Sequence, residues 1–179
     1  MTFDKSMTTI PFILGGPSGV GKSHFCAFLK NEGWLYLEGD GFSGPGIDGL
    51  NLRKPWDEFW NCYNPRPLAQ ELTTRRDKDG RSGVVLSLPS NAIPTPKHIE
   101  SAKSILNVRF LYGHPSFCLR DFLERERTAG RNLSSVDHWD AHNRNVFATL
   151  STSLYHNLLI EVFMSDGSRI PWNEVAKRI

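Results

Sequence analysis

The stretch LGGPSGVGKSHF, residues 14–25, decides the fold. The short apolar run before it, residues 10–14, predicts a buried strand, and the residues after it have helical spacing. Between the two, residues 16–23 fit the pattern G-x-x-x-x-G-K-S, which needs a strand before it and a helix after it. The stretch therefore predicts a phosphate-binding loop.

The residue types of this loop suit a nucleotide phosphate. Glycines let consecutive backbone N–H groups turn toward one anion, and the positive end of the helix that begins near Lys22 adds attraction. The Lys22 ammonium can reach the β- and γ-phosphates, and the Ser23 hydroxyl can ligate Mg²⁺. We therefore predict ATP and Mg²⁺ as cofactors, Ser23 as a metal ligand, and a nucleotide site made of Gly16, Ser18, Gly19, Val20, Gly21, Lys22, Ser23 and His24.

The bulk composition indicates one globular domain. The chain has 179 residues, and its hydrophobic share of 39% is enough for a substantial core. A net charge of +2 argues mildly against a long nucleic-acid strand as partner. No apolar stretch reaches membrane length, and the N-terminus has an acid where a signal peptide has basic residues, so we expect a cytoplasmic protein without a membrane partner. Homodimer formation stays open.

The cysteines exclude two kinds of small scaffold. Cys26, Cys62 and Cys118 are odd in number, lie far apart and form no CxxC pair. This spacing favours neither a disulfide framework nor a zinc knuckle. We expect three separate thiols, buried or half-buried, in a reducing compartment.

Strands and helices alternate along the chain. The pattern predicts strands at residues 10–14, 34–38, 83–88, 107–112 and 157–163, with helices between them. Right-handed crossovers then give a parallel sheet, and we predict a three-layer α/β P-loop fold with strand order 2-3-1-4-5. We expect a single domain, residues 1–179, with an acceptor-binding insertion at about residues 41–80 and a lid at about residues 125–142.

An acidic pair follows the second predicted strand. Asp40 could accept a proton from a substrate hydroxyl, and Glu38 could hold a water of the Mg²⁺ shell; either could instead have only a local structural role. Motor and transporter ATPases carry an acid at the end of a later apolar strand, and neither the third nor the fifth strand here ends in one. The chain also lacks the N-K-x-D motif of GTPases. The placement favours phosphate transfer over hydrolysis.

Arginines near the predicted lid could stabilise the transferred phosphate. Arg127 and Arg131 stand at the end of the helix predicted over residues 117–129 and at the start of the polar stretch after it. Planar guanidinium groups neutralise the oxygens of a transferring phosphoryl group well, although a solvated helix with Glu–Arg pairs would have the same sequence. Arg53 follows the glycine-rich loop after Asp40, where an acceptor would bind.

Four segments resemble the gluconate kinase and shikimate kinase group of small P-loop kinases and, more broadly, the nucleoside monophosphate kinases: GPSGVGKS, YLEGDGF, RKPWDEFW and RFLYGHPSFCLRDFLERERTAGR. The resemblance covers most of the chain as an order of elements, and its specific motif is the phosphate loop. It implies that Asp40 acts as a base on the acceptor and that lid arginines among Arg125, Arg127 and Arg131 clamp the transferring phosphate. The segment PSNAIPTP after the third strand departs from both kinase patterns.

Together these observations predict a Mg²⁺-dependent kinase that moves the γ-phosphate of ATP to a hydroxyl of a small molecule, such as a sugar acid. Lys22, Asp40, Arg127 and Arg131 would be catalytic, and Asp40 and Arg53 would bind the acceptor. Two alternatives stay open: a kinase for nucleotides or nucleic-acid ends, and a non-catalytic ATP-binding regulator.

Overall fold

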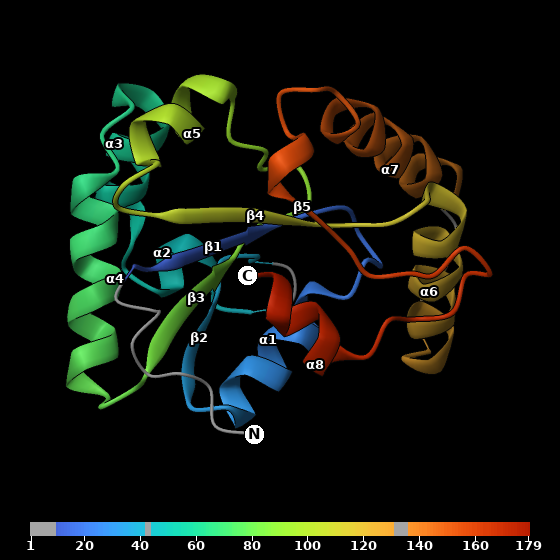
Figure 1. Ribbon diagram of the computed structural model, residues 1–179, viewed down its shortest axis with the longest axis horizontal. Helices are drawn as coiled ribbons and strands as arrows, with labels where there is room; N and C mark the ends of the chain where they lie inside the picture. The colour runs from blue at the N-terminus through green and yellow to red at the C-terminus, as the bar shows by residue number, and fades with distance from the viewer. Residues whose placement is uncertain (1–9, 42–43, 131–135) are drawn as a thin grey trace. The chain divides into compact units, whose positions relative to one another are not determined.

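In the computed structural model of the chain, residues 10–41, 44–130 and 136–179 are described. Within them five strands form one sheet in the order β2-β3-β1-β4-β5 (Figure 1). The strands are β1 (Phe12–Gly15), β2 (Trp34–Glu38), β3 (Gly83–Ser87), β4 (Asn107–Tyr112) and β5 (Leu159–Glu161). The predicted parallel α/β fold and its strand order are confirmed.

The chain forms two compact units. Of the described residues, the first unit contains 10–14 together with those of Ser23–Pro89 and Pro94–Val108. The second unit contains Gly15–Lys22, Ser90–Ile93 and Arg109–Ile179. The phosphate loop as far as Lys22 thus belongs to the second unit, and Ser23 with the acids after β2 belongs to the first.

The first unit is built on three parallel strands. β2 pairs with β3 from Trp34↔Gly83 to Glu38↔Ser87, and β3 pairs with β1. Every residue of β3 is buried, as a central strand of a parallel sheet requires. The helices of this unit are α1 (Lys22–Asn31, from Ser23 on), α2 (Gly46–Gly49), α3 (Arg53–Cys62), α4 (Arg66–Lys78) and α5 (Pro96–Ala102). The predicted insertion, residues 41–80, contains α2, α3 and α4.

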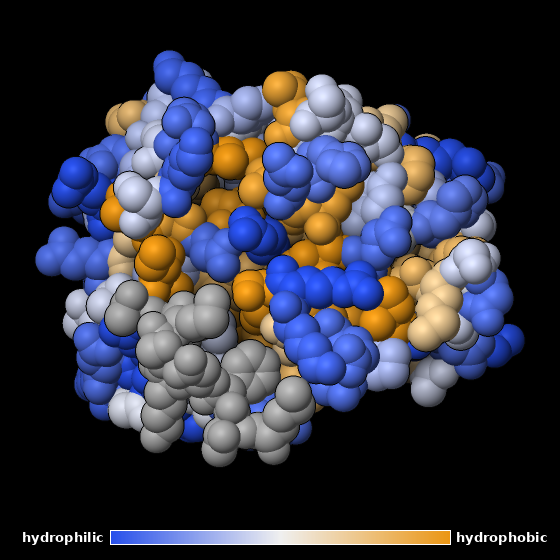
Figure 2. Space-filling model, in the orientation of Figure 1, coloured by the Kyte–Doolittle hydropathy of each residue, from blue (hydrophilic) through white to orange (hydrophobic). Residues whose placement is uncertain are grey.

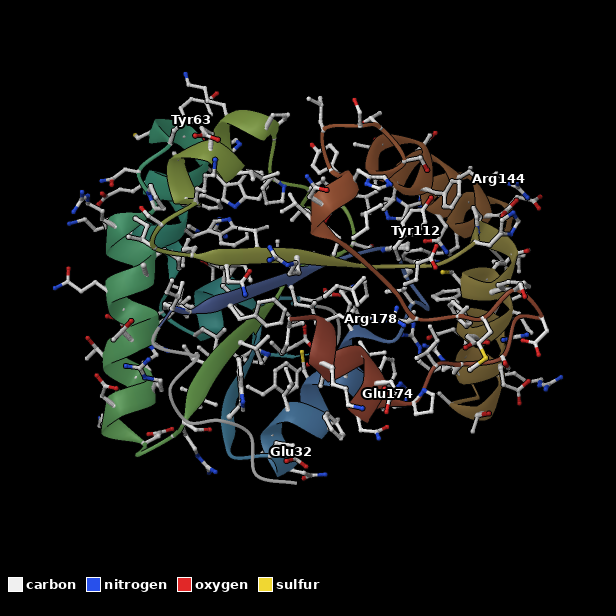
Figure 3. All side chains as sticks on the ribbon, in the orientation of Figure 1. Glu32, Tyr63, Tyr112, Arg144, Glu174 and Arg178 are labelled. Atoms are coloured by element: carbon white, nitrogen blue, oxygen red, sulfur yellow. The ribbon has the colours of Figure 1, made fainter. Side chains whose placement is uncertain are left out.

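Helix α4 packs along β2 and β3, and hydrophilic residues cover its outward face at the left of the view (Figure 2). A histidine of α5 joins α5 to the end of α3. His98 contacts the carbonyl oxygen of Trp60 at 2.9 Å through Nε2, and its ring packs on those of Phe59, Trp60 and Tyr63. Tyr63 lies where α3 ends, next to α5 (Figure 3). This aromatic cluster ties the insertion to the rest of the first unit.

The second unit joins β4 and β5 to three helices. β4 pairs with β5 from Phe110↔Leu159 to Tyr112↔Glu161. The helices are α6 (Pro115–Thr128), α7 (Val136–Leu150) and α8 (Trp172–Val175), with α6 and α7 side by side. The predicted strand over residues 157–163 was too long, because a 3₁₀ turn (His156–Leu158) precedes β5 and Phe163 leaves the ladder to bridge with Arg169.

The cysteines differ in exposure. Cys26 and Cys118 are buried, whereas Cys62 is exposed. The prediction of a buried or half-buried thiol was therefore wrong for Cys62, which lies on the outward face of α3. Within the described ranges, no helix is both long and apolar enough to cross a bilayer.

Candidate functional site

The phosphate loop needs glycine at three of its positions. Gly16, Gly19 and Gly21 have φ values of +132°, +78° and +99°, which other residues rarely adopt. A Cβ on Gly19 would lie 2.0 Å from the carbonyl oxygen of Cys118, and one on Gly21 would lie 2.7 Å from Arg169 Nη1. The loop backbone therefore packs directly against α6 and the segment after β5, and neither Gly19 nor Gly21 can carry a side chain.

Lys22 folds back over the loop that precedes it. Its ammonium Nζ donates to the carbonyl oxygens of Gly16 at 2.8 Å and Pro17 at 3.2 Å. The two bonds hold a positive charge beside the turn of the loop. A phosphate-binding loop needs its charge at this position, because the backbone N–H groups supply only partial charges.

Helix α7 holds the loop from a position that sequence reasoning missed. The side-chain amide of Asn143 accepts from Ser18 N at 3.0 Å and donates to Ser18 O at 3.1 Å. Asn143 is fully buried, so these bonds satisfy its amide away from water. The signal in the sequence was a polar residue within the apolar repeat of a helix, because such a residue needs a partner.

A chain of hydroxyl groups continues from the same loop residue. Ser18 Oγ donates to Ser90 Oγ at 3.1 Å, and His142 Nε2 lies 3.0 Å from that same oxygen. Burial lowers the pKa of His142, and the positive charges of His138 and Lys22 lower it further. His142 is therefore neutral at pH 7, so its ring can either donate to or accept from Ser90.

In the first unit, Glu38 joins three groups at the end of β2. Its Oε2 accepts from Ser23 Oγ at 3.4 Å and from the Tyr36 hydroxyl, and its Oε1 accepts from Asp40 N at 3.4 Å. Burial raises the pKa of Tyr36, and the Glu38 carboxylate raises it further, so the phenol keeps its proton and donates. The carboxylate is thereby directed toward the first turn of α1.

Asp40 follows directly and shapes the next loop. Gly39 N donates to the carbonyl oxygen of Ser87 at 2.9 Å, which keeps the chain on the sheet edge for one residue beyond β2. Gly44 N then donates to Asp40 O at 2.9 Å. Asp40 is half-buried at the carboxyl end of the strand, which is where parallel sheets bind their ligands.

Arg53 is held by acids that sequence reasoning did not connect to it. It forms two 2.7 Å bonds to Asp48 and a 3.7 Å ion pair with Asp57, and Asp48 raises the pKa of its guanidinium. It lies at one end of an open groove of about 480 Å³ along α3, lined by Arg53, Lys54, Asp57, Glu58, Asn61 and Cys62. Its role toward an acceptor stays a prediction.

The predicted lid residues fall at the ends of two helices. Arg127 lies in the last turn of α6, is 71% exposed and pairs with Glu124. Arg125 pairs with Glu126 at 2.7 Å. Arg131 lies outside the described residues. His24, in the first turn of α1, is exposed. The alternative of a solvated helix with Glu–Arg pairs thus describes the contacts of Arg127, and its role toward a phosphate stays a prediction.

Two solved structures share the fold of this chain along nearly its whole length. A gluconokinase from Sinorhizobium meliloti 1021 has 20% identity and a TM-score of 0.51, covering 94% of this chain and 88% of its own. A shikimate kinase from Acinetobacter baumannii, in complex with shikimate, has 19% identity and a TM-score of 0.50, covering 97% and 93%. The chain has the fold of these P-loop kinases. No protein-family model matches the sequence, and no curated protein is significantly similar to it.

Proposed function

We propose that the chain is a kinase that transfers the γ-phosphate of ATP, in the presence of Mg²⁺, to a hydroxyl group of a small molecule. The observation that carries the proposal is a glycine loop closed over Lys22 and followed at once by Ser23, whose hydroxyl bonds to Glu38. The likeness to a gluconokinase and a shikimate kinase supports it at the level of the fold.

The residues present fit both a nucleotide phosphate and a magnesium ion. At Gly19 and Gly21 the loop has the backbone conformations that let a phosphate loop turn its N–H groups toward an anion, and Lys22 supplies full charge. Ser23 and Glu38 offer a hydroxyl and a carboxylate, the hard oxygen ligands that Mg²⁺ prefers. When bound, Mg²⁺ would neutralise charge on the β- and γ-phosphates.

In the proposed reaction each of the predicted site residues has one role. Asp40 would orient the acceptor hydroxyl and take its proton as the hydroxyl oxygen bonds to the γ-phosphorus. The bond from that phosphorus to the β–γ bridging oxygen breaks, ADP leaves, and Lys22 stabilises the charge on the phosphate oxygens. Arg127 and Arg131 would neutralise the transferred group, and Arg53 would contact the acceptor. Each of these roles is part of the proposal.

The test is ADP release with Mg²⁺-ATP against a panel of sugar acids, polyols, shikimate, nucleosides and nucleoside monophosphates, with a control that contains no acceptor. One compound that raises ADP release far above the control would establish the kinase and name its acceptor. High release in the control alone would make the protein an ATPase. ATP binding with a flat panel would favour the non-catalytic regulator.

A variant separates the chemistry from nucleotide binding. Asp40→Asn keeps the size of the side chain and removes the base, so we expect kcat to fall by about 10²–10⁴-fold while the affinity for ATP is kept. Asp79→Asn, at the exposed end of α4, is the matched control and should behave like the native protein. Unchanged turnover in Asp40→Asn would show that Asp40 is not the base.

A further inference from the structure

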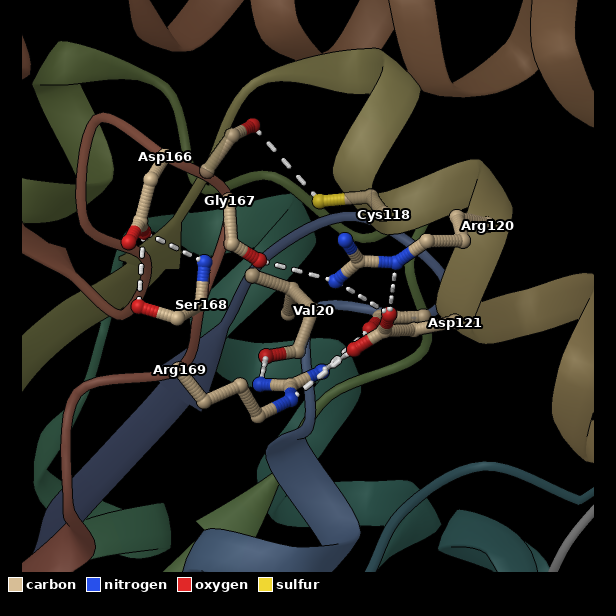
Figure 4. Close-up of polar contacts among 10 residues, drawn as sticks. Val20, Cys118, Arg120, Asp121, Asp166, Gly167, Ser168 and Arg169 are labelled. Atoms are coloured by element: carbon tan, nitrogen blue, oxygen red, sulfur yellow. Dashed lines mark hydrogen bonds and ion pairs between the residues drawn. The ribbon is translucent and has the colours of Figure 1, made fainter.

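One arginine after β5 is bonded to the backbone of the phosphate loop. Arg169 donates from Nη1 to the carbonyl oxygen of Val20 at 2.9 Å (Figure 4). It also donates from Nη2 to the carbonyl oxygen of Gly19 at 2.9 Å. Its other edge faces Asp121 of α6, with Nε 2.9 Å and Nη2 2.7 Å from the carboxylate. A single guanidinium thus connects α6 to two successive peptides of the loop.

We propose that Arg169, held by Asp121, is a positioning residue that sets the phosphate loop for anion binding. The carbonyl and the N–H of a trans peptide point in opposite directions. Anchoring the carbonyl of Val20 on Arg169 therefore directs the N–H of Gly21 away from the guanidinium. Anchoring the carbonyl of Gly19 does the same for the N–H of Val20, which makes a long 3.4 Å bond to Pro17 O.

Two aromatic rings also pack against the guanidinium. It lies over the rings of Phe163, 4.5 Å from the centroid, and Trp172, 5.4 Å from the centroid. A Cβ on Gly21 would meet both Arg169 and Trp172, at 2.7 and 2.9 Å. These contacts leave one orientation in which the planar fork reaches both carbonyl groups and the carboxylate.

The backbone of Arg169 is also held in place. Residues 163–169 form a tight turn in which Met164 N donates to Ser168 O at 2.8 Å. Asp166 Oδ1 closes the turn by accepting from Ser168 N at 2.8 Å and from its hydroxyl at 2.7 Å (Figure 4). The chain therefore delivers Arg169 to the loop from a rigid support.

The role is geometric rather than a supply of charge. The carboxylate of Asp121 offsets the positive charge of Arg169 at 2.7 Å, so the pair adds little net attraction for a phosphate. Lys22 is the cation of the loop. A lysine at position 169 would keep the charge but could not serve two carbonyl groups and a carboxylate at once.

The test measures binding of pyrophosphate and of ADP to the full chain by calorimetry, with folding checked by circular dichroism. We expect Arg169→Lys and Arg169→Gln each to weaken both ligands by about tenfold or more, because each loses hydrogen bonds between a charged group and the loop. Arg178→Gln, in the last turn of the chain, is the matched control. Asp121→Asn leaves Arg169 in place and should weaken both ligands by a smaller factor, so it tests the same contact if the arginine variants fold poorly.

Three results would overturn the proposal. Native affinity in Arg169→Lys together with loss in Arg169→Gln would show that charge alone matters. A loss for ADP but not for pyrophosphate would place the effect at the nucleoside. Native affinity in Asp121→Asn and in folded Arg169→Gln would show that the contact has no effect on binding. The proposed role of Arg169 rests on the phosphate loop of the proposed kinase, but its test uses no acceptor. If no compound of the acceptor panel raises ADP release, the kinase proposal fails and the role of Arg169 is unaffected.

Discussion

The two regions that carry the candidate site are built in different ways. In the second unit the phosphate loop is held through its backbone by Asn143, Arg169 and Lys22, and Asn143 is fully buried. In the first unit Glu38 is held by side-chain bonds near solvent, from Ser23 and Tyr36. A region fixed through its backbone tolerates few substitutions, whereas a region fixed by side chains can be tuned one bond at a time.

The largest effect is expected from a methyl group added to the phosphate loop. Gly19→Ala places a Cβ 2.0 Å from the carbonyl oxygen of Cys118, at a φ of +78°. We expect a loss of about 2–4 kcal/mol in the free energy of unfolding, from backbone strain and overpacking together. ATP affinity should fall below detection. Both are measured by urea denaturation and calorimetry.

Gly130→Ala is the matched control, since Gly130 has a similar φ of +65° and nothing lies within 4 Å of its added Cβ. It should lose only about 1 kcal/mol, the cost of the backbone conformation alone. Equal losses in the two variants would mean that the close packing of the loop against α6 contributes nothing.

The next effect is the removal of the buried amide. Asn143→Leu keeps the volume but leaves the N–H and C=O groups of Ser18 without their partner. We expect a loss of about 1–3 kcal/mol in stability, the cost of unpaired buried polar groups, with weaker ATP binding. Asn145→Leu, on the exposed face of the same helix, should change neither. If the two variants behave alike, α7 does not hold the loop.

The sequence predicted the short-range features of the site but not the contacts between distant residues. Local patterns were enough for the five strands, the phosphate loop and the acids after β2, because strand burial and the glycine–lysine spacing are short-range properties. The anchors of the loop were missed because Asn143 lies 125 residues from Ser18 and Arg169 lies 150 from Gly19. Only folding brings such pairs together. The sequence predicted no role for either residue.

The boundaries were less accurate for a related reason. The apolar run at residues 157–163 is continuous in the sequence, yet β5 contains only Leu159–Glu161. The ladder with β4 ends at Tyr112↔Glu161, and beyond it Val162 O accepts from Ile170 N while Phe163 bridges to Arg169. Periodicity within one segment does not contain this information.

A smaller effect, on the Mg²⁺ dependence of turnover, is expected from a substitution in the first unit. Tyr36→Phe removes the hydroxyl that donates to Glu38 and leaves the ring in place. We expect the Mg²⁺ concentration for half-maximal turnover to rise by about threefold to tenfold, because the carboxylate loses one of the bonds that direct it toward Ser23. At saturating Mg²⁺, kcat should stay within about twofold, since Tyr36 makes no contact with the reacting groups of the proposed mechanism.

Tyr63→Phe is the matched control, because its ring packs on His98 in the aromatic cluster at α5. Since burial raises the pKa of Tyr36, the phenol keeps its proton and the native half-saturation constant should be flat from pH 7 to pH 9. A fall in kcat at saturating Mg²⁺, or no change in Mg²⁺ dependence, would contradict the assigned role.

The smallest effect concerns the reactivity of the cysteine thiols, which reports how deeply each of them is buried. Burial raises the pKa of Cys118 to about 12, and its thiol lies 3.5 Å from the carbonyl oxygen of Gly113. At pH 8 only about 10⁻⁴ of such a thiol is the reactive thiolate, whereas the exposed Cys62 of α3 has no such protection. Iodoacetamide should therefore modify Cys62 first in the native protein, and Cys26 and Cys118 only in denaturant.

Peptide mapping identifies the sites, and Cys62→Ser should remove the fast reaction. Rapid native modification of Cys118 would mean that the packing of α6 against the phosphate loop opens readily, and the contrast between a rigid loop and a tunable carboxylate would fail.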